Sequence, residues 1–194
     1  MRIRLESRAD ALCQTIAGVD MTSTVEPGTD VLDSLLGIAP GTDLYKVRHA
    51  RDKVVAATQG SHELFFDPGL QDNLSLAERL LVAYYVCRLT PQALLADYYL
   101  EQLQAQAVDP ALIAAIDHGA IASLDAVRLQ AILGFTRTLI ESPVEGDRAA
   151  LQTLQDAGLS SSEIVVLAQL IAFLSYQVRL AAGLGALSTL GEAQ

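Results

Sequence analysis

The segment from Asn73 to Ala107 most strongly limits what this chain can fold into, because it has the pattern of two successive helices. Ser75 and Glu78 have the spacing of a capping box, in which each residue's side chain accepts a hydrogen bond from the other's backbone N–H. The apolar residues that follow have the spacing of a mostly buried helix: Leu76, Leu80, Leu81, Ala83, Tyr84 and Cys87. Thr90-Pro91 then predicts a second helix start, with Thr90 as the cap and Pro91 as the first helical residue.

Further helices are predicted on both sides of this segment, and no run has the alternation typical of a strand. Capping residues, prolines and glycines set their boundaries. The expected helices lie at about residues 31–36, 44–65 (as one or two helices), 111–117, 125–141 and 147–157. Apolar residues make up 51% of the chain and aromatic residues only 5%, which favours packed helices. The sequence therefore predicts an all-α multi-helix bundle at residues 29–190, after an N-terminal arm at residues 1–28.

The longest apolar helix is expected near the C-terminus. Ser160 and Glu163 form a second capping box, and an apolar helix follows from Ile164 to about Ala182. Gly183 and Gly185 are expected to end it. Since this helix is apolar on most of its circumference, it should lie at the centre of the fold or in a subunit interface.

Two blocks of the sequence resemble the alkylhydroperoxidase D/carboxymuconolactone decarboxylase superfamily. The first block matches the opening of the family's signature helix at Ser75, Glu78, Arg79, Leu81, Val82 and Ala83. The second, A-G-L-S-S-S-E-I at residues 157–164, followed by R-L-A-A-G-L-G at residues 179–185, looks like the family's closing segment. The resemblance covers roughly residues 30–187 and implies an alkylhydroperoxidase D-like helical bundle.

The same resemblance implies a thiol relay in the family's peroxidase members, made of a glutamate, two cysteines and a histidine. Counted without gaps, these positions fall here on Leu80, Gln92, Leu95 and Tyr99. Peroxide reduction needs a thiolate and a resolving thiol, which these side chains lack. We expect a degenerate member with no catalytic residue of the family in place. The four positions are the candidate residual pocket, where Tyr99 either presents its hydroxyl beside Gln92 or fills the space of the lost site.

No cofactor or metal site is predicted from the remaining residues. Cys13 and Cys87 have no metal or redox spacing, and Cys87 reads as a small buried residue of an apolar helix. The three histidines, His49, His62 and His118, lie on different segments without metal-ligand spacing, and we expect structural or surface roles for them.

The charge of the chain limits its partners. A formal net charge of −10 disfavours binding to nucleic acid. The longest apolar run, 164–174, is much shorter than the roughly 20 residues of a membrane span, and no signal peptide is visible, so we expect a cytoplasmic protein. The basic cluster at residues 46–53 is interpreted as a solvated helix face or, alternatively, a docking surface for a partner's acidic patch.

Two classes of function remain open. The first is a non-redox protein that acts by assembly, as a homo-oligomer or together with a cysteine-bearing relative of the same family. The second is a small-molecule binding protein or acid–base enzyme of decarboxylase type that uses the residual pocket. An alkylhydroperoxidase-related antioxidant activity is a further alternative implied by the resemblance.

Overall fold

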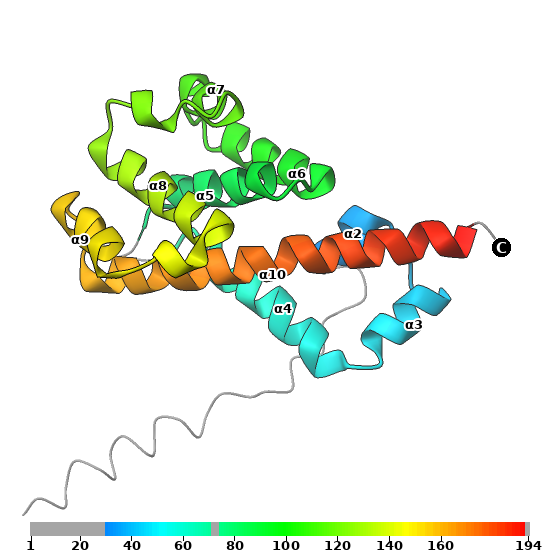
Figure 1. The fold of residues 1–194 in the computed structure, drawn as a ribbon. Coiled ribbons are helices and arrows are strands. Elements are labelled where there is room, and N and C mark those ends of the chain that lie inside the picture. Colours follow the sequence, from blue (N-terminus) through cyan, green and yellow to red (C-terminus); the bar gives the residue numbers. More distant parts are fainter. Residues whose placement is uncertain (1–29, 71–73, 193–194) are drawn as a thin grey trace, which may run out of the picture.

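The computed structural model describes residues 30–70 and 74–192, and these residues form helices connected by short turns (Figure 1). The predicted N-terminal arm, 1–28, lies outside the described residues. The elements are α2 (Val31–Leu36), α3 (Asp43–His49), α4 (Asp52–Phe65), α5 (Leu76–Leu89), α6 (Ala93–Ala105), α7 (Pro110–Asp117), η1 (Ile121–Ser123), α8 (Val127–Glu141), η2 (Pro143–Glu145), α9 (Arg148–Asp156) and α10 (Ser161–Glu192). No strand occurs within the described ranges, so the all-α prediction is confirmed.

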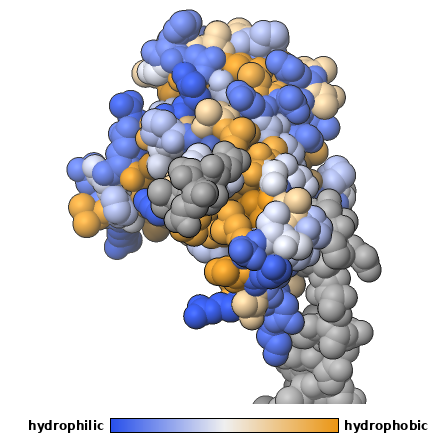
Figure 2. Space-filling view, turned by 90° about the vertical axis from the view of Figure 1, so that its right-hand side faces the viewer, coloured by the Kyte–Doolittle hydropathy of each residue, from blue (hydrophilic) through white to orange (hydrophobic). Residues whose placement is uncertain are grey.

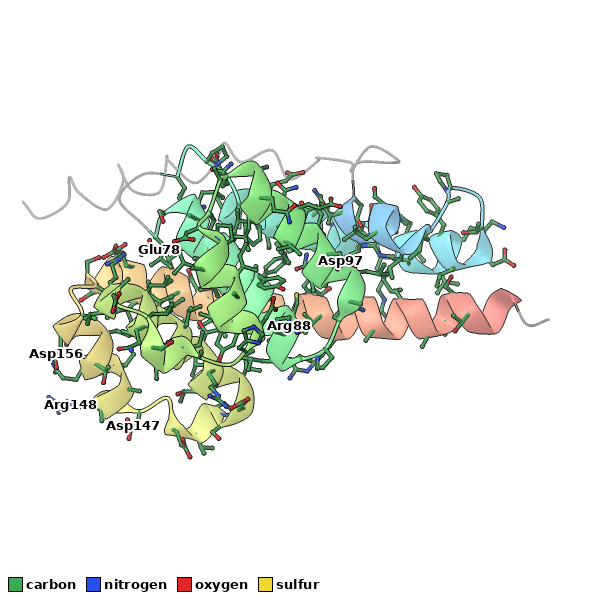
Figure 3. All side chains as sticks on the ribbon, turned by 90° about the horizontal axis from the view of Figure 1, so that it is seen from above. Glu78, Arg88, Asp97, Asp147, Arg148 and Asp156 are labelled. Carbon is green, nitrogen blue, oxygen red and sulfur yellow. The ribbon has the colours of Figure 1, made fainter. Side chains whose placement is uncertain are left out.

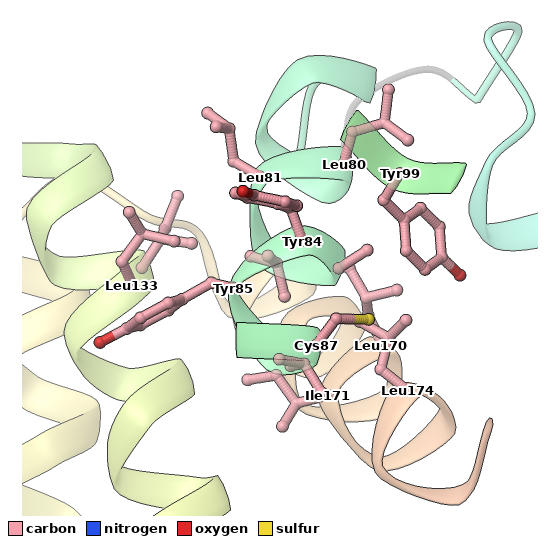
Figure 4. Packing of buried hydrophobic residues seen from close by; sticks show 14 of the residues in the cluster. Leu80, Leu81, Tyr84, Tyr85, Cys87, Tyr99, Leu133, Leu170, Ile171 and Leu174 are labelled. Carbon is pink, nitrogen blue, oxygen red and sulfur yellow. The ribbon is translucent and has the colours of Figure 1, made fainter. Parts of the chain in front are cut away.

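Helix α5 lies at the centre of the fold. Nine consecutive residues, from Arg79 to Cys87, are buried, so the helix is covered on every side over this stretch. Its neighbours are α6, α8 and α10, and side chains from all four helices form one core (Figure 4). Helix α4 contacts α10 on the side opposite to α8. It lies below α10 in Figure 1.

A single arginine connects the starts of two long helices. Both predicted capping boxes are present: Ser75 with Glu78 before α5, and Ser160 with Glu163 before α10. Each glutamate uses one carboxylate oxygen for its cap and offers the other to Arg128 of α8, at 2.8 Å and 2.6 Å. In Figure 3, Glu78 accordingly lies close to the N-terminal part of α10.

The connection between α5 and α6 differs from the sequence prediction. Thr90 ends α5 as its C-cap, and α6 begins at Ala93 with Gln92 as its N-cap. Thr90 has extended dihedrals (φ −118°, ψ 91°), as expected for a residue before proline. Pro91 therefore lies between the helices, and the Gln92 side chain accepts from the Leu94 N–H at 3.1 Å in the role predicted for Thr90.

Helix α10 continues ten residues beyond its predicted end at about Ala182, so the expected stop at Gly183 and Gly185 is wrong. A glycine inside a helix costs about 1 kcal/mol relative to alanine, which packing can offset. Here the C-terminal half of α10 packs against α2: Leu184 is buried, and Leu36 lies 3.7 Å from where a side chain on Gly185 would begin. Burial against α2 therefore outweighs the local preference of the two glycines.

The predicted basic cluster contains two side chains that point inward. Arg48 of α3 forms ion pairs with Asp30 and Asp33 at the start of α2, and both carboxylates are buried. His49 Nε2 lies 2.7 Å from the second carboxylate oxygen of Asp33. The His49 ring also stacks on Tyr45, with ring centroids 3.9 Å apart. Taken as whole residues, those of α3 are exposed or half-buried. This helix is therefore attached through charged groups, and only part of the basic cluster forms a solvated face.

Candidate functional site

The four residues predicted for the residual pocket lie in different environments. Leu80, Leu95 and Tyr99 are buried members of the core, and Figure 4 shows Tyr99 on the side of α5 that carries Leu80 and Cys87. Gln92 is half-buried, and its side-chain oxygen is used in the cap of α6. The structure thus places three of the positions in apolar packing between α5 and α6 and the fourth at a helix start.

Among the described residues, Cys87 is the one cysteine, and its apolar surroundings keep the thiol protonated. Its side chain lies among Leu170, Leu174 and Tyr99 in the core (Figure 4), and the residue is 2% exposed. Burial raises the pKa of the Cys87 thiol to about 12. A thiolate is the reactive form in peroxide reduction, and this thiol does not supply it near neutral pH. Cys13 lies outside the described residues.

The Tyr99 hydroxyl has a polar partner inside the core. It donates to the side-chain oxygen of Gln177 in α10 at 2.7 Å, and neither residue is more than 1% exposed. Burial raises the pKa of the phenol well above its usual value. The Tyr99 ring and this hydrogen bond therefore join α6 to α10 inside the core.

Gln177 extends this contact to His62, a residue the sequence interpretation assigned a structural or surface role. The Gln177 amide nitrogen lies 3.4 Å from His62 Nδ1, and His62 Nε2 lies 3.1 Å from the Tyr98 hydroxyl. Because Tyr99 donates to the Gln177 oxygen, the Gln177 nitrogen donates to Nδ1, and Nε2 carries the ring proton. We call the chain Tyr99–Gln177–His62–Tyr98 the polar chain.

The polar chain is held in a neutral state by its surroundings. His62 is buried and packs against the rings of Phe66, Tyr98 and Tyr99. Burial lowers the pKa of His62 to about 4, although Glu63 and Asp30 oppose this shift. The imidazole is therefore uncharged near pH 7. No local motif in the sequence marks this arrangement, because its members come from α4, α6 and α10.

A metal site is not evident in the part of the chain that the structure describes. Across residues 30–70 and 74–192, no three His, Cys, Asp or Glu side chains form a group that could hold a metal ion. By length and composition alone, Ser161–Thr189 of α10 could cross a membrane, but the core helix of a soluble protein passes the same test.

Comparison with known proteins supports the fold. No protein-family model matches the chain, and no curated protein matches it either. The crystal structure of an uncharacterized peroxidase-related protein from Silicibacter sp. TM1040 resembles this chain with a TM-score of 0.62 and 20% sequence identity. The match covers 80% of this chain and 79% of that chain. The chain therefore has the all-α fold of a peroxidase-related protein, in agreement with the predicted alkylhydroperoxidase D-like bundle.

Proposed function

We propose that this chain is a non-redox protein of the alkylhydroperoxidase D-like fold that acts by assembly with copies of itself or with a cysteine-bearing relative. A shared fold does not by itself imply a shared activity, so the proposal depends on the residues of this chain.

The absence of accessible sulfur in the described core supports the non-redox part of the proposal. The family's cysteine positions carry Gln92 and Leu95, and neither side chain can attack a peroxide. Cys87 is on the preceding helix, is enclosed by apolar side chains and has a raised pKa. A thiol relay needs two cysteines that meet at an accessible surface.

The assembly part rests on one observation, the apolar surface that α10 leaves uncovered. In its most apolar stretch, only 44% of the residues are buried within the molecule. Tyr176 and Leu187 of α10 are both more than 40% exposed. Figure 2 looks along α10 from its C-terminal end and shows hydrophobic surface between the surrounding polar groups. Exposed apolar surface of this kind is typical of interaction sites.

The charge distribution along α10 also favours contact between copies. The chain carries a formal net charge of −10, which opposes association in general. From Ile164 to Gly191, however, Arg179 is the single charged residue. Two copies can therefore bring their α10 surfaces together without placing carboxylates against carboxylates.

Mass in solution tests the assembly proposal. Sedimentation and light scattering should give at least a dimer at micromolar concentration, or a complex when a cysteine-bearing relative is added. A strict monomer that binds no relative would contradict the proposal. In a parallel assay the chain should consume no hydroperoxide with a dithiol reductant, and a Cys87→Ser variant should behave in the same way. If the unmodified chain consumed hydroperoxide and the Cys87→Ser variant did not, the non-redox assignment would be overturned.

Acid–base chemistry is a second candidate, and the polar chain is the observation that favours it. Such an activity would require the Tyr99 hydroxyl to leave Gln177 and face a ligand. The expected result for this candidate is that Tyr99→Phe or Gln92→Ala abolishes binding of a small carboxylic acid. Unchanged binding in both variants would exclude these two residues from the site.

A further inference from the structure

The outward face of α4 has the spacing of a coiled-coil seam without a partner in the described structure. Val54, Ala57, Ser61 and Leu64 follow one another at intervals of three, four and three residues, which is the spacing of positions a and d in a heptad. Val54 is 51% and Leu64 is 60% exposed. The opposite face of α4 is buried in the core through Val55, Thr58, Gln59 and His62. The seam is therefore additional to the surface that α4 needs for folding.

A groove runs beside this seam, between α4 and α10. It has a volume of about 340 Å³ and is lined by Lys53, Val54, Ala57, Thr58, Ser61, Phe173 and Tyr176. A hydrogen bond of 3.0 Å between the Thr58 and Tyr176 hydroxyls connects its two walls. Because Thr58 donates its hydroxyl proton to the Val54 carbonyl, Tyr176 is the donor in this bond. The fixed walls and apolar lining suit the insertion of an apolar side chain.

The charges on one flank of the seam are arranged for pairing with an identical helix. Lys53 and Asp67 are fourteen residues apart, or two heptads, with Gly60 midway between them. Lys53 is exposed at the start of α4, and Asp67 is exposed just beyond its end. An antiparallel copy places Lys53 opposite the oppositely charged Asp67, whereas a parallel copy places each charge opposite itself. Charge complementarity therefore selects a second copy in antiparallel orientation.

We propose that α4 pairs with α4 of a second copy in an antiparallel, two-fold symmetric contact. Val54 of each copy packs against Leu64 of the other, and Ala57 packs against Ser61. Small residues at the centre allow close approach, and nothing lies within 4 Å of the position where a Gly60 side chain would begin. Leu64 of each copy enters the groove beside Val54 of the other. The inference rests on the proposed assembly and adds to the α10 surface an isologous contact through the neighbouring helix α4.

Disulfide cross-linking tests the orientation directly. In a Cys13→Ser background, Val54→Cys alone and Leu64→Cys alone should give little cross-linked dimer on mild oxidation. Each introduced cysteine would lie roughly 15 Å along the axis from its own counterpart. An equimolar mixture of the two variants should give a heterodimer of Val54→Cys with Leu64→Cys. Cross-linking of the single variants without a mixed product would indicate a parallel contact and overturn the proposal.

Association measurements separate this interface from assembly in general. Ala57→Glu places a charge at the centre of the seam and should weaken self-association by about tenfold or more. Val144→Glu, at a position that is 90% exposed in η2, is the matched control and should leave association unchanged. Circular dichroism should show that both variants keep the helical fold. A monomeric unmodified chain would overturn both proposals. If the unmodified chain formed an oligomer and Ala57→Glu did not weaken its self-association, the α4 contact would be overturned while the proposed assembly would stand.

Discussion

His62 shows how a single residue can be neutral because of its position in the fold. Its ring lies under Phe66, Tyr98 and Tyr99, and both ring nitrogens have partners. Protonating the ring would place a second proton on Nδ1, which faces the amide nitrogen of Gln177. The charged form would therefore lose a hydrogen bond as well as its hydration.

Stability should depend on pH through His62. Its pKa is about 4 in the fold and about 6.5 when exposed, so the unfolded chain binds the proton more tightly. The free energy of unfolding should thus fall as the pH is lowered from about 6.5 to 4, by about 3 kcal/mol from this residue. Urea unfolding of the unmodified chain and of His62→Gln across this range isolates the contribution. Parallel pH profiles for the two proteins would contradict it.

The polar chain also shows what the sequence could not predict at the residue scale. Gln177 contacts His62 and Tyr99 at sequence separations of 115 and 78 residues, and such separations leave no local pattern. Hydrophobic spacing correctly predicted that Cys87 would be buried. The family resemblance predicts Gln92 as part of a residual pocket, whereas the hydrogen bond that it accepts from the Leu94 N–H depends on where α6 begins.

At the scale of elements, local signals predicted helix starts better than helix ends. Ser75 and Ser160 lie where capping chemistry predicted them, because a cap is made by residues within one turn. Thr90 is the exception, since Gln92 caps α6 instead. The end of α10 was missed because its stability depends on α2, which is distant in the sequence. The all-α class was predictable from spacing, but the sharing of Arg128 between two caps was not.

Replacing Arg128 should loosen the starts of α5 and α10 together. Its guanidinium bonds Glu78 and Glu163 at once and is one-third exposed, so we expect Arg128→Gln to cost about 1–2 kcal/mol of unfolding free energy. Chemical unfolding of this variant, of Glu163→Gln and of the double variant gives the coupling energy. Arg137→Gln removes an exposed pair with Glu141 and should cost less than about 0.5 kcal/mol. If the effects of Arg128→Gln and Glu163→Gln on the free energy of unfolding were fully additive, that result would contradict the shared contact.

Gly183→Ala should stabilise the chain. Gly183 lies inside α10, and nothing occupies the space within 4 Å of the position where its side chain would begin. Alanine there should raise the free energy of unfolding by about 0.5–1 kcal/mol. Gly158→Ala is the opposite case, since φ is +87° and alanine would be strained. Thermal unfolding should show a higher midpoint for the first variant and a lower one for the second.

At the scale of the whole molecule, charge and apolar surface act against each other. The formal net charge of −10 makes copies repel, whereas the surfaces of α10 and α4 favour contact. Salt screens charge over a distance of about 10 Å at 0.1 M and leaves apolar contact intact.

Self-association should therefore strengthen as salt is added. Raising sodium chloride from about 0.05 M to about 0.5 M should lower the apparent dissociation constant, because repulsion between the acidic copies is screened. Sedimentation velocity at several concentrations measures this change. Weaker association in high salt would mean that ion pairs, such as Lys53 with Asp67, dominate the contact.

The attachment of α3 has a consequence for motion. Taken as whole residues, those of α3 are exposed or half-buried. The ion pairs of Arg48 with Asp30 and Asp33 and the contact of His49 with Asp33 hold the helix to α2. Detaching α3 exposes little apolar surface, so local opening there should need less free energy than unfolding of the α5 core. In native-state hydrogen exchange, backbone amides of residues 46–49 should exchange well before those of residues 80–87. An Asp33→Asn change should hasten exchange at α3 while leaving the α5 amides protected.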